Sequence, residues 1–78
     1  MAQYDNIFTN RALSKMKQWQ LSESQVLDAY NSGDVEKSKF GGWNAIKKYQ
    51  GYEIGVYYVK DGQTGQYKIV SVWKRNRR

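Results

Sequence analysis

The chain has 78 residues, which is enough for one small domain with a thin core between one sheet and a few helical turns. It contains no Cys and no His, which excludes a disulfide framework, zinc chemistry and catalysis by Cys or a Ser–His pair, and we expect no metal and no cofactor. Residues 40–78 hold eight of the 13 Lys and Arg residues and two of the seven acidic ones, so the whole net charge of +6 lies in this half. A positive charge of this size fits nucleic acid, an acidic protein or an anionic membrane surface as the binding partner.

The N-terminal sequence Met-Ala-Gln-Tyr-Asp has neither the basic nor the apolar region of a secretion signal, and the longest apolar runs are far below membrane-spanning length. The sequence therefore predicts a cytoplasmic protein with no membrane partner. Its content of 15% aromatic and 40% apolar residues is typical of a folded chain.

The first predicted element is a helix that starts between Asp5 and Thr9, either of which could cap it, and ends near Gln18. Helical spacing predicts a buried face that consists of Phe8, Ala12, Leu13, Met16 and Trp19. Arg11, Lys15 and Gln18 are expected to face solvent.

The second helix begins at Ser22, because Gln25 three residues later completes a capping box and Leu21 and Val26 stand at the positions of a hydrophobic staple. Its predicted buried face consists of Val26, Leu27 and Tyr30. Gly33 supplies the stop.

From Val35 onward, β-type residues and turn residues replace the helical spacing, and 35–40 is predicted as a loop or a short edge strand before Gly41-Gly42. Three strands follow as an antiparallel meander with hairpin loops at 50–51 and 61–65: Asn44–Tyr49, Tyr52–Lys60 and Gln66–Lys74. The fold class is therefore α+β, with two N-terminal helices packed on a three- to four-stranded antiparallel sheet. We expect a single domain over 1–78, made of a helical pair at 5–33, a sheet at 35–75 and a basic tail at 76–78.

The register of the last hairpin can be predicted, because a five-residue loop pairs Lys60 with Gln66 and sets Val56 opposite Val70 and Ile54 opposite Val72, on the core face. The opposite face would then be aromatic and rimmed by cations, with Lys48 beside Glu53; its other members are Gly55, Tyr57, Tyr67, Ile69, Ser71, Trp73 and Arg75. A shallow spot is expected where Gly55 faces Ser71.

Such a face has two interpretations. Aromatic rings stack on unpaired bases while Lys and Arg hold the flanking phosphates, so the face fits nucleic acid. Alternatively, Tyr and Trp are strand formers whose cross-strand pairs stabilise a small sheet. The strand end, where Trp73 runs into Lys74-Arg75-Asn76-Arg77-Arg78, favours contact with phosphate.

Five segments resemble a family of small bacterial domains of unknown function, similar in fold to the RelE, ParE and BrnT toxins: Phe8-Thr9-Asn10-Arg11-Ala12, Met16, Leu21-Ser22-Glu23-Ser24-Gln25-Val26, Tyr52-Glu53-Ile54-Gly55-Val56 and Ile69-Val70-Ser71-Val72-Trp73-Lys74-Arg75. The resemblance implies a RelE-like fold and a toxin-type, metal-independent ribonuclease that acts on messenger RNA at the ribosome. An antitoxin would be its tight partner.

The resemblance also implies roles for sheet residues. The catalytic candidates are Lys47, Lys48, Tyr57 and Arg75, with Tyr67 as the alternative to Tyr57 and Arg77 beside Arg75. Nucleic acid would be bound by Tyr67, Trp73, Lys74, Arg75, Arg77 and Arg78. Glu53 is either a base or the neutralising neighbour of Lys48.

The chain also departs from the family pattern. Asn10 stands where related domains often have His, which excludes a His-dependent mechanism, and Trp19-Gln20 replaces a common Arg-Gly.

The sequence leaves three hypotheses about function. A ribonuclease predicts that Lys47, Lys48, Tyr57 and Arg75 converge on one concave patch. A noncatalytic nucleic-acid-binding module predicts binding that weakens with salt, without cleavage. A protein-interaction domain predicts an exposed edge strand.

Overall fold

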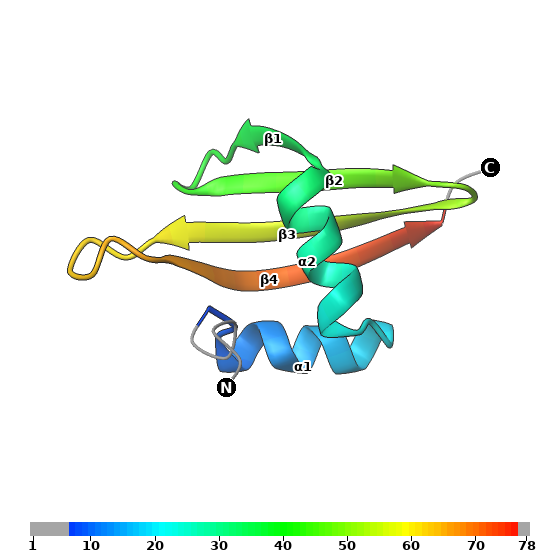
Figure 1. The fold of residues 1–78 in the computed structure, drawn as a ribbon, viewed down its shortest axis with the longest axis horizontal. Helices are drawn as coiled ribbons and strands as arrows, with labels where there is room; N and C mark the ends of the chain where they lie inside the picture. Colours follow the sequence, from blue (N-terminus) through cyan, green and yellow to red (C-terminus); the bar gives the residue numbers. More distant parts are fainter. Residues whose placement is uncertain (1–6, 77–78) are drawn as a thin grey trace.

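Two helices precede a four-stranded antiparallel sheet in the computed structural model, which describes residues 7–76 (Figure 1). The strands pair in the order in which they follow in the chain, as a meander. The elements are α1 (Asn10–Trp19), α2 (Glu23–Ser32), β1 (Asp34–Lys37), β2 (Trp43–Tyr49), β3 (Tyr52–Lys60) and β4 (Tyr67–Asn76). The predicted α+β class and the antiparallel meander are confirmed.

Helix α1 begins after Thr9, whose side-chain oxygen accepts a hydrogen bond from the backbone N–H of Ala12 at 3.1 Å. The other expected cap, Asp5, lies outside the described residues. Only a narrow stripe of α1 is buried, at Ala12 and Met16, because the helix runs along β4 (Figure 1). The prediction for Leu13 and Trp19 is therefore wrong: these two side chains are 43% and 38% exposed.

Helix α2 has the predicted ends. The Gln25 N–H donates to the Ser22 hydroxyl at 3.2 Å and the Ser22 N–H donates to the Gln25 side chain at 2.9 Å, which completes the capping box. At the other end, the Gly33 N–H donates to the Ala29 carbonyl at 2.8 Å. Gly33 is needed because a Cβ there would collide with the Ala29 carbonyl and with the β2 backbone at Ile46.

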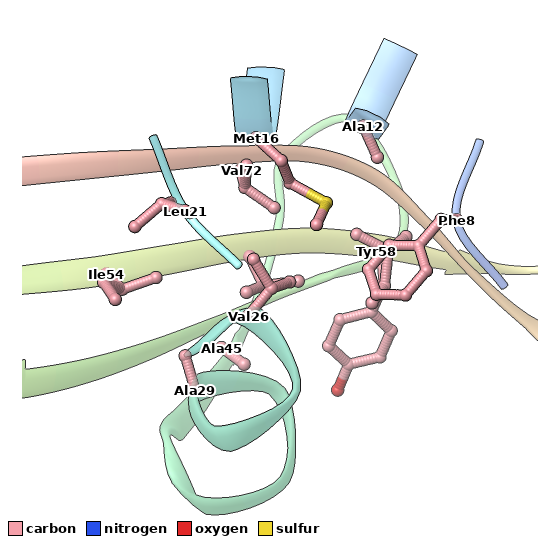
Figure 2. Packing of buried hydrophobic residues seen from close by; sticks show 12 residues of the cluster. Phe8, Ala12, Met16, Leu21, Val26, Ala29, Ala45, Ile54, Tyr58 and Val72 are labelled. Carbon is pink, nitrogen blue, oxygen red and sulfur yellow. The ribbon is translucent and has the colours of Figure 1, made fainter. Parts of the chain in front are cut away.

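The core lies between one face of the sheet and the two helices, and α2 crosses the sheet over it (Figures 1 and 2). Val26 and Ala29 enter it from α2, and Ala45, Val56 and Val72 form one row across the sheet below them. The buried cluster as a whole contains Phe8, Ala12, Met16, Leu21, Val26, Ala29, Ala45, Ile54, Val56, Tyr58, Ile69 and Val72.

The predicted register of the last hairpin is wrong. Lys60 pairs with Tyr67 instead of Gln66, so six residues rather than five separate the two strands. Within this loop the Asp61 N–H donates to the Gln66 carbonyl at 2.7 Å. The register then shifts between Tyr57 and Tyr58, which leaves Val70 as the extra residue of a β-bulge. The bulge allows Ile69 and Val72, three residues apart, to be buried on the same face.

The bulge coincides with the place where the segment before α1 joins β4. Phe8 forms a parallel bridge with Ile69, the Ile69 N–H donates to the Ile7 carbonyl at 2.6 Å, and the Thr9 N–H donates to the Ile69 carbonyl at 3.1 Å. The outer edge of β4 is thus hydrogen-bonded at this point. Ile69 faces the core beside Phe8, whereas regular strand alternation predicted it on the opposite face.

Candidate functional site

The outer face of the sheet is the face turned away from α2, and its residues follow from strand alternation and the observed register. Cross-strand pairing arranges them in three rows: Glu36, Asn44, Tyr57 and Ser71; then Asp34, Ile46, Gly55 and Trp73; then Lys48, Glu53 and Arg75. Five of the seven predicted members are present. Tyr67 and Ile69 lie on the helix-covered face instead, because the bulge reverses the alternation of β4.

The shallow spot expected between Gly55 and Ser71 is absent, because Gly55 lies opposite Trp73. The Trp73 indole covers Gly55 so closely that a Cβ at position 55 would overlap the ring atoms Cε2, Cζ2 and Nε1. Because glycine has no side chain, the indole packs directly on the β3 backbone at Gly55.

A cleft of about 530 Å³ opens beside this indole, where the outer face meets α1 and the loop between β1 and β2. It is lined by three aromatic side chains, two serines, one amide, one aliphatic side chain and one cation: Phe40, Tyr57, Trp73, Ser38, Ser71, Asn44, Val70 and Arg11. Among these lining residues there is no carboxylate. The cleft therefore offers ring surfaces, a few hydrogen-bonding groups and one positive charge.

The loop that carries Phe40 is held against the cleft wall. The Tyr57 hydroxyl donates to the Gly41 carbonyl at 2.8 Å, and the Ser38 N–H donates to the Gly42 carbonyl at 3.1 Å. Gly41 and Gly42 have φ angles of 89° and 76°, which non-glycine residues rarely adopt. This anchored loop presents a Phe40 side chain that is 91% exposed.

Charges of opposite sign separate across the outer face. Asp34 and Glu36 lie on β1, at one edge, whereas Arg11 reaches the cleft from the α1 side. In the third row, Glu53 is buried between Lys48 and Arg75, and the Arg75 Nη1 atom lies 3.9 Å from its Oε2 atom. The predicted neighbours Lys48 and Glu53 are confirmed, and the geometry favours neutralisation of cations as the role of Glu53.

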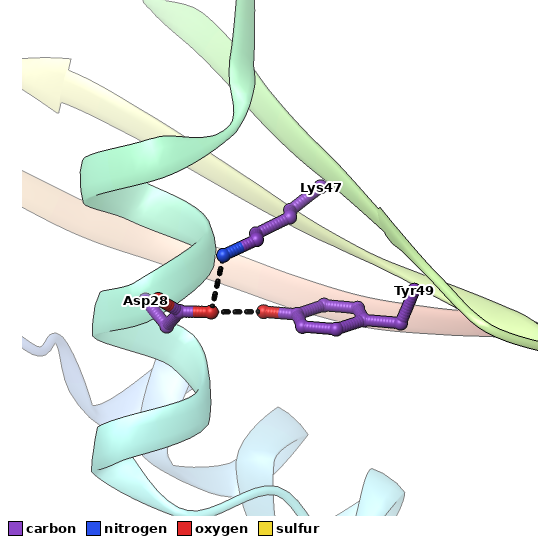
Figure 3. Close-up of polar contacts among 3 residues, drawn as sticks. All are labelled: Asp28, Lys47 and Tyr49. Atoms are coloured by element: carbon purple, nitrogen blue, oxygen red, sulfur yellow. Dashed lines mark hydrogen bonds and ion pairs between the residues drawn. The ribbon is translucent and has the colours of Figure 1, made fainter.

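The expected convergence of four catalytic candidates is wrong, because Lys47 belongs to the helix-covered face. Its Nζ atom lies 2.8 Å from the Asp28 carboxylate on α2, and the Tyr49 hydroxyl donates to the same oxygen at 2.6 Å (Figure 3). The hydrogen bonds from Lys47 and Tyr49 hold the pKa of Asp28 below its usual value. Burial, reinforced by the bond to Asp28, raises the pKa of Tyr49. This triad connects α2 to β2.

The other three candidates, Lys48, Tyr57 and Arg75, share the outer face, but only Tyr57 lines the cleft. Its hydroxyl proton is committed to the Gly41 carbonyl, so the cleft is offered the ring rather than a free proton donor.

The expected nucleic-acid-binding residues are similarly divided. Trp73 and Arg75 lie on the outer face. Tyr67 packs edge-on against Tyr58 on the other face, and Lys74 lies over the Tyr52 ring there, at 4.9 Å from its centroid. Arg77 and Arg78 lie outside the described residues.

Five of the eight cleft residues were not predicted from the sequence. Arg11 was expected to face solvent and Val70 to face the core, and no role was expected for Ser38, Phe40 or Asn44. An available signal was the phenylalanine directly before Gly41-Gly42, a large apolar residue on a turn. The predicted Lys48–Glu53 pairing was the available signal for Asn44, because it places Asn44 opposite Tyr57 on the outer face. For Arg11 the sequence holds no such signal, because its place in the cleft depends on how α1 lies against β4.

Between residues 7 and 76, no helix is long and apolar enough to cross a membrane, and no group of His, Cys, Asp and Glu side chains could hold a metal ion. No protein-family model, curated protein or solved structure matches the chain.

Proposed function

We propose that the protein binds single-stranded RNA across the outer face of the sheet, with the cleft at the centre of the contact. The observation that carries the proposal is the cleft itself, where three aromatic side chains and Arg11 surround a space that no carboxylate borders. Stacking on an aromatic side chain contributes about 1–3 kcal/mol per base, and cations beside the rings hold the phosphates.

The charge of the chain supports a polyanionic ligand. The net charge of the chain is +6. Two of its cations, Lys48 and Arg75, lie on the outer face beyond the cleft, on either side of Glu53. Asp34 and Glu36 at the β1 edge would repel phosphate, so we expect the backbone of the RNA to follow the side of the face nearer α1 and β4. RNA, rather than DNA, follows from the resemblance to the RelE, ParE and BrnT toxins.

That resemblance also extends the proposal to a RelE-like fold, a toxin-type ribonuclease and an antitoxin partner. Cleavage has less support than binding, because Lys47 faces away and the Tyr57 proton is engaged. One observation favours a protein partner as second candidate: every residue of β1, an edge strand of the sheet, is exposed. Two of these four residues are acidic, which would favour a basic partner over an acidic antitoxin at this edge.

The test is fluorescence anisotropy with a labelled single-stranded RNA of about 12 nucleotides, beside the same RNA as a duplex, from roughly 0.05 to 0.2 M salt. We expect the single strand to bind more tightly than the duplex, and its affinity to fall as salt rises. Incubated samples of the same RNA, run on a denaturing gel, report cleavage.

Arg11→Ala is the site variant, and Lys17→Ala is its matched control, because it removes one exposed cation from the same helix outside the cleft. Arg11→Ala should weaken binding by about tenfold, as expected for a charge-assisted phosphate contact, whereas Lys17→Ala should have a smaller effect. No RNA binding at the lowest salt, or equal weakening by the two variants, would contradict the proposal.

A further inference from the structure

We infer that the cleft holds one unpaired nucleotide, with its base against the aromatic walls and its phosphate on Arg11. The inference rests on the proposed function and specifies which part of the RNA enters the cleft. Its smallest ligand would be a nucleoside monophosphate.

The size of the cleft supports a ligand of this kind. A volume of about 530 Å³ falls within the roughly 300–1,000 Å³ typical of sites for small molecules and cofactors. A single nucleotide is a ligand of this small-molecule class. A base can enter only when it is unstacked and unpaired, since a duplex buries both ring faces of every base.

The chemistry of the lining matches the base and the phosphate of a nucleotide. Trp73, Tyr57 and Phe40 offer ring surfaces for the base. The Asn44 amide carries both donors and an acceptor and has no hydrogen-bond partner among residues 7–76, so it is available to a base edge. Arg11 is the one cation of the lining and suits a phosphate bidentately.

The cleft is also formed in advance of binding. The Trp73 indole packs on Gly55, and the Tyr57 hydroxyl is hydrogen-bonded to the loop at 38–42. These two aromatic side chains therefore do not have to be ordered by the ligand. Phe40 is the exception, since it is almost fully exposed on that anchored loop. A base in the cleft would give Phe40 a ring to pack on.

The experiment is an NMR titration of the ¹⁵N-labelled protein with AMP, UMP, adenosine and inorganic phosphate in separate samples. We expect AMP to shift the Trp73 indole and the Gly42 and Asn44 signals. AMP should bind more tightly than UMP, because a purine offers more stacking surface, and at least fivefold more tightly than adenosine or phosphate alone.

Phe40→Ala tests the aromatic wall, with Leu13→Ala as the matched removal of an exposed apolar side chain outside the cleft. We expect Phe40→Ala to weaken AMP binding by roughly fivefold or more and Leu13→Ala to leave it unchanged. Arg11→Ala should reduce the affinity for AMP to that for adenosine. All three side chains are exposed, so the fold should persist, and the amide spectrum reports this directly.

The outcomes separate this inference from the proposed function. If single-stranded RNA binds but AMP produces no shifts in the cleft, the one-nucleotide site is refuted while the proposed function stands. If phosphate matches AMP, the cleft is an anion site and the inference also fails. If neither AMP nor RNA binds, the proposed function itself is refuted.

Discussion

Because the Trp73 indole packs directly on Gly55, we predict that one methyl group at position 55 disturbs both the sheet and the cleft. A Cβ at this position would overlap three atoms of the indole. The φ angle of Gly55 is not positive, so alanine can adopt its backbone conformation without strain. The whole cost of Gly55→Ala is therefore steric.

The size of the effect follows from two opposing terms. Forcing an extra carbon into a packed site costs about 1–3 kcal/mol. Replacing glycine in a strand interior returns roughly 0.5–1 kcal/mol, because the unfolded chain loses conformational freedom. We expect a net decrease of about 1–2 kcal/mol in the free energy of unfolding, and each 1 kcal/mol lowers the Tm of a domain of this size by about 4–8 °C.

Urea unfolding followed by circular dichroism measures this decrease. Gly62→Ala is the matched control, because nothing lies within 4 Å of a Cβ there and its φ angle is not positive, so it should be neutral or slightly stabilising. Adding Gly55→Ala to Trp73→Ala should cost little, since the indole is already gone. Equal stability of Gly55→Ala and Gly62→Ala would refute the packing argument.

Two further predictions concern the helices. Gln20 ends α1 with φ 57° and ψ 44°, so Gln20→Gly should relieve left-handed strain and raise the free energy of unfolding by about 0.5–1 kcal/mol. Gln18→Gly, inside the helix, should lower the free energy of unfolding by about 1 kcal/mol. Similar urea midpoints for the two variants would contradict this prediction. The pKa of Asp28 is lowered in the folded state from its ordinary value of 3.8, so the Lys47 and Tyr49 bonds stabilise the fold above that pH and their contribution is lost as pH falls through the lower, folded value. The difference in urea midpoint between the protein and Asp28→Asn should therefore shrink between about pH 6 and pH 3, and a difference that stays constant would contradict the linkage.

Local signals predicted the elements well. The Ser22–Gln25 capping box acts within one helical turn, so the start of α2 could be predicted from neighbouring residues, whereas Thr9 was one of two expected caps for α1. The hairpins were found for the same reason, since Gly51 and Gly65 mark their turns with positive φ angles.

The register of β4 could not be predicted from the loop alone. One extra loop residue and one bulged residue, Val70, each move the pairing by one position, and the bulge coincides with contacts from the distant segment before α1. The spacing of Ile69 and Val72 held the only local hint, since a regular strand cannot bury both on one face.

The site was predicted in part for the same physical reason. Tyr57, Trp73 and Arg75 were assigned to the outer face because alternation fixes them once the face is chosen, and the bulge lies before Ser71. Lys47 and Lys48 are adjacent and have to point to opposite faces, so they cannot both belong to one patch. Arg11 entered the cleft only through the tertiary placement of α1.

The central claim is that RNA meets the outer face and not the helix-covered face, and adjacent residues of β2 and β4 provide the most direct test. Lys48→Gln/Arg75→Gln removes two cations from the outer face, and Lys47→Gln/Lys74→Gln removes two from the other face of the same strands. Each pair also contains one ion-pair partner, of Glu53 or of Asp28, and the two variants are matched in charge.

The measurement is the affinity of both variants for the same single-stranded RNA over a range of salt concentrations. We predict that the affinity of the outer-face variant falls by about tenfold or more and that its salt slope decreases by roughly 0.7 for each phosphate that is no longer neutralised, while the helix-face variant binds almost as the unmodified protein does. Equal weakening in the two variants, or greater weakening in the helix-face variant, would contradict the account.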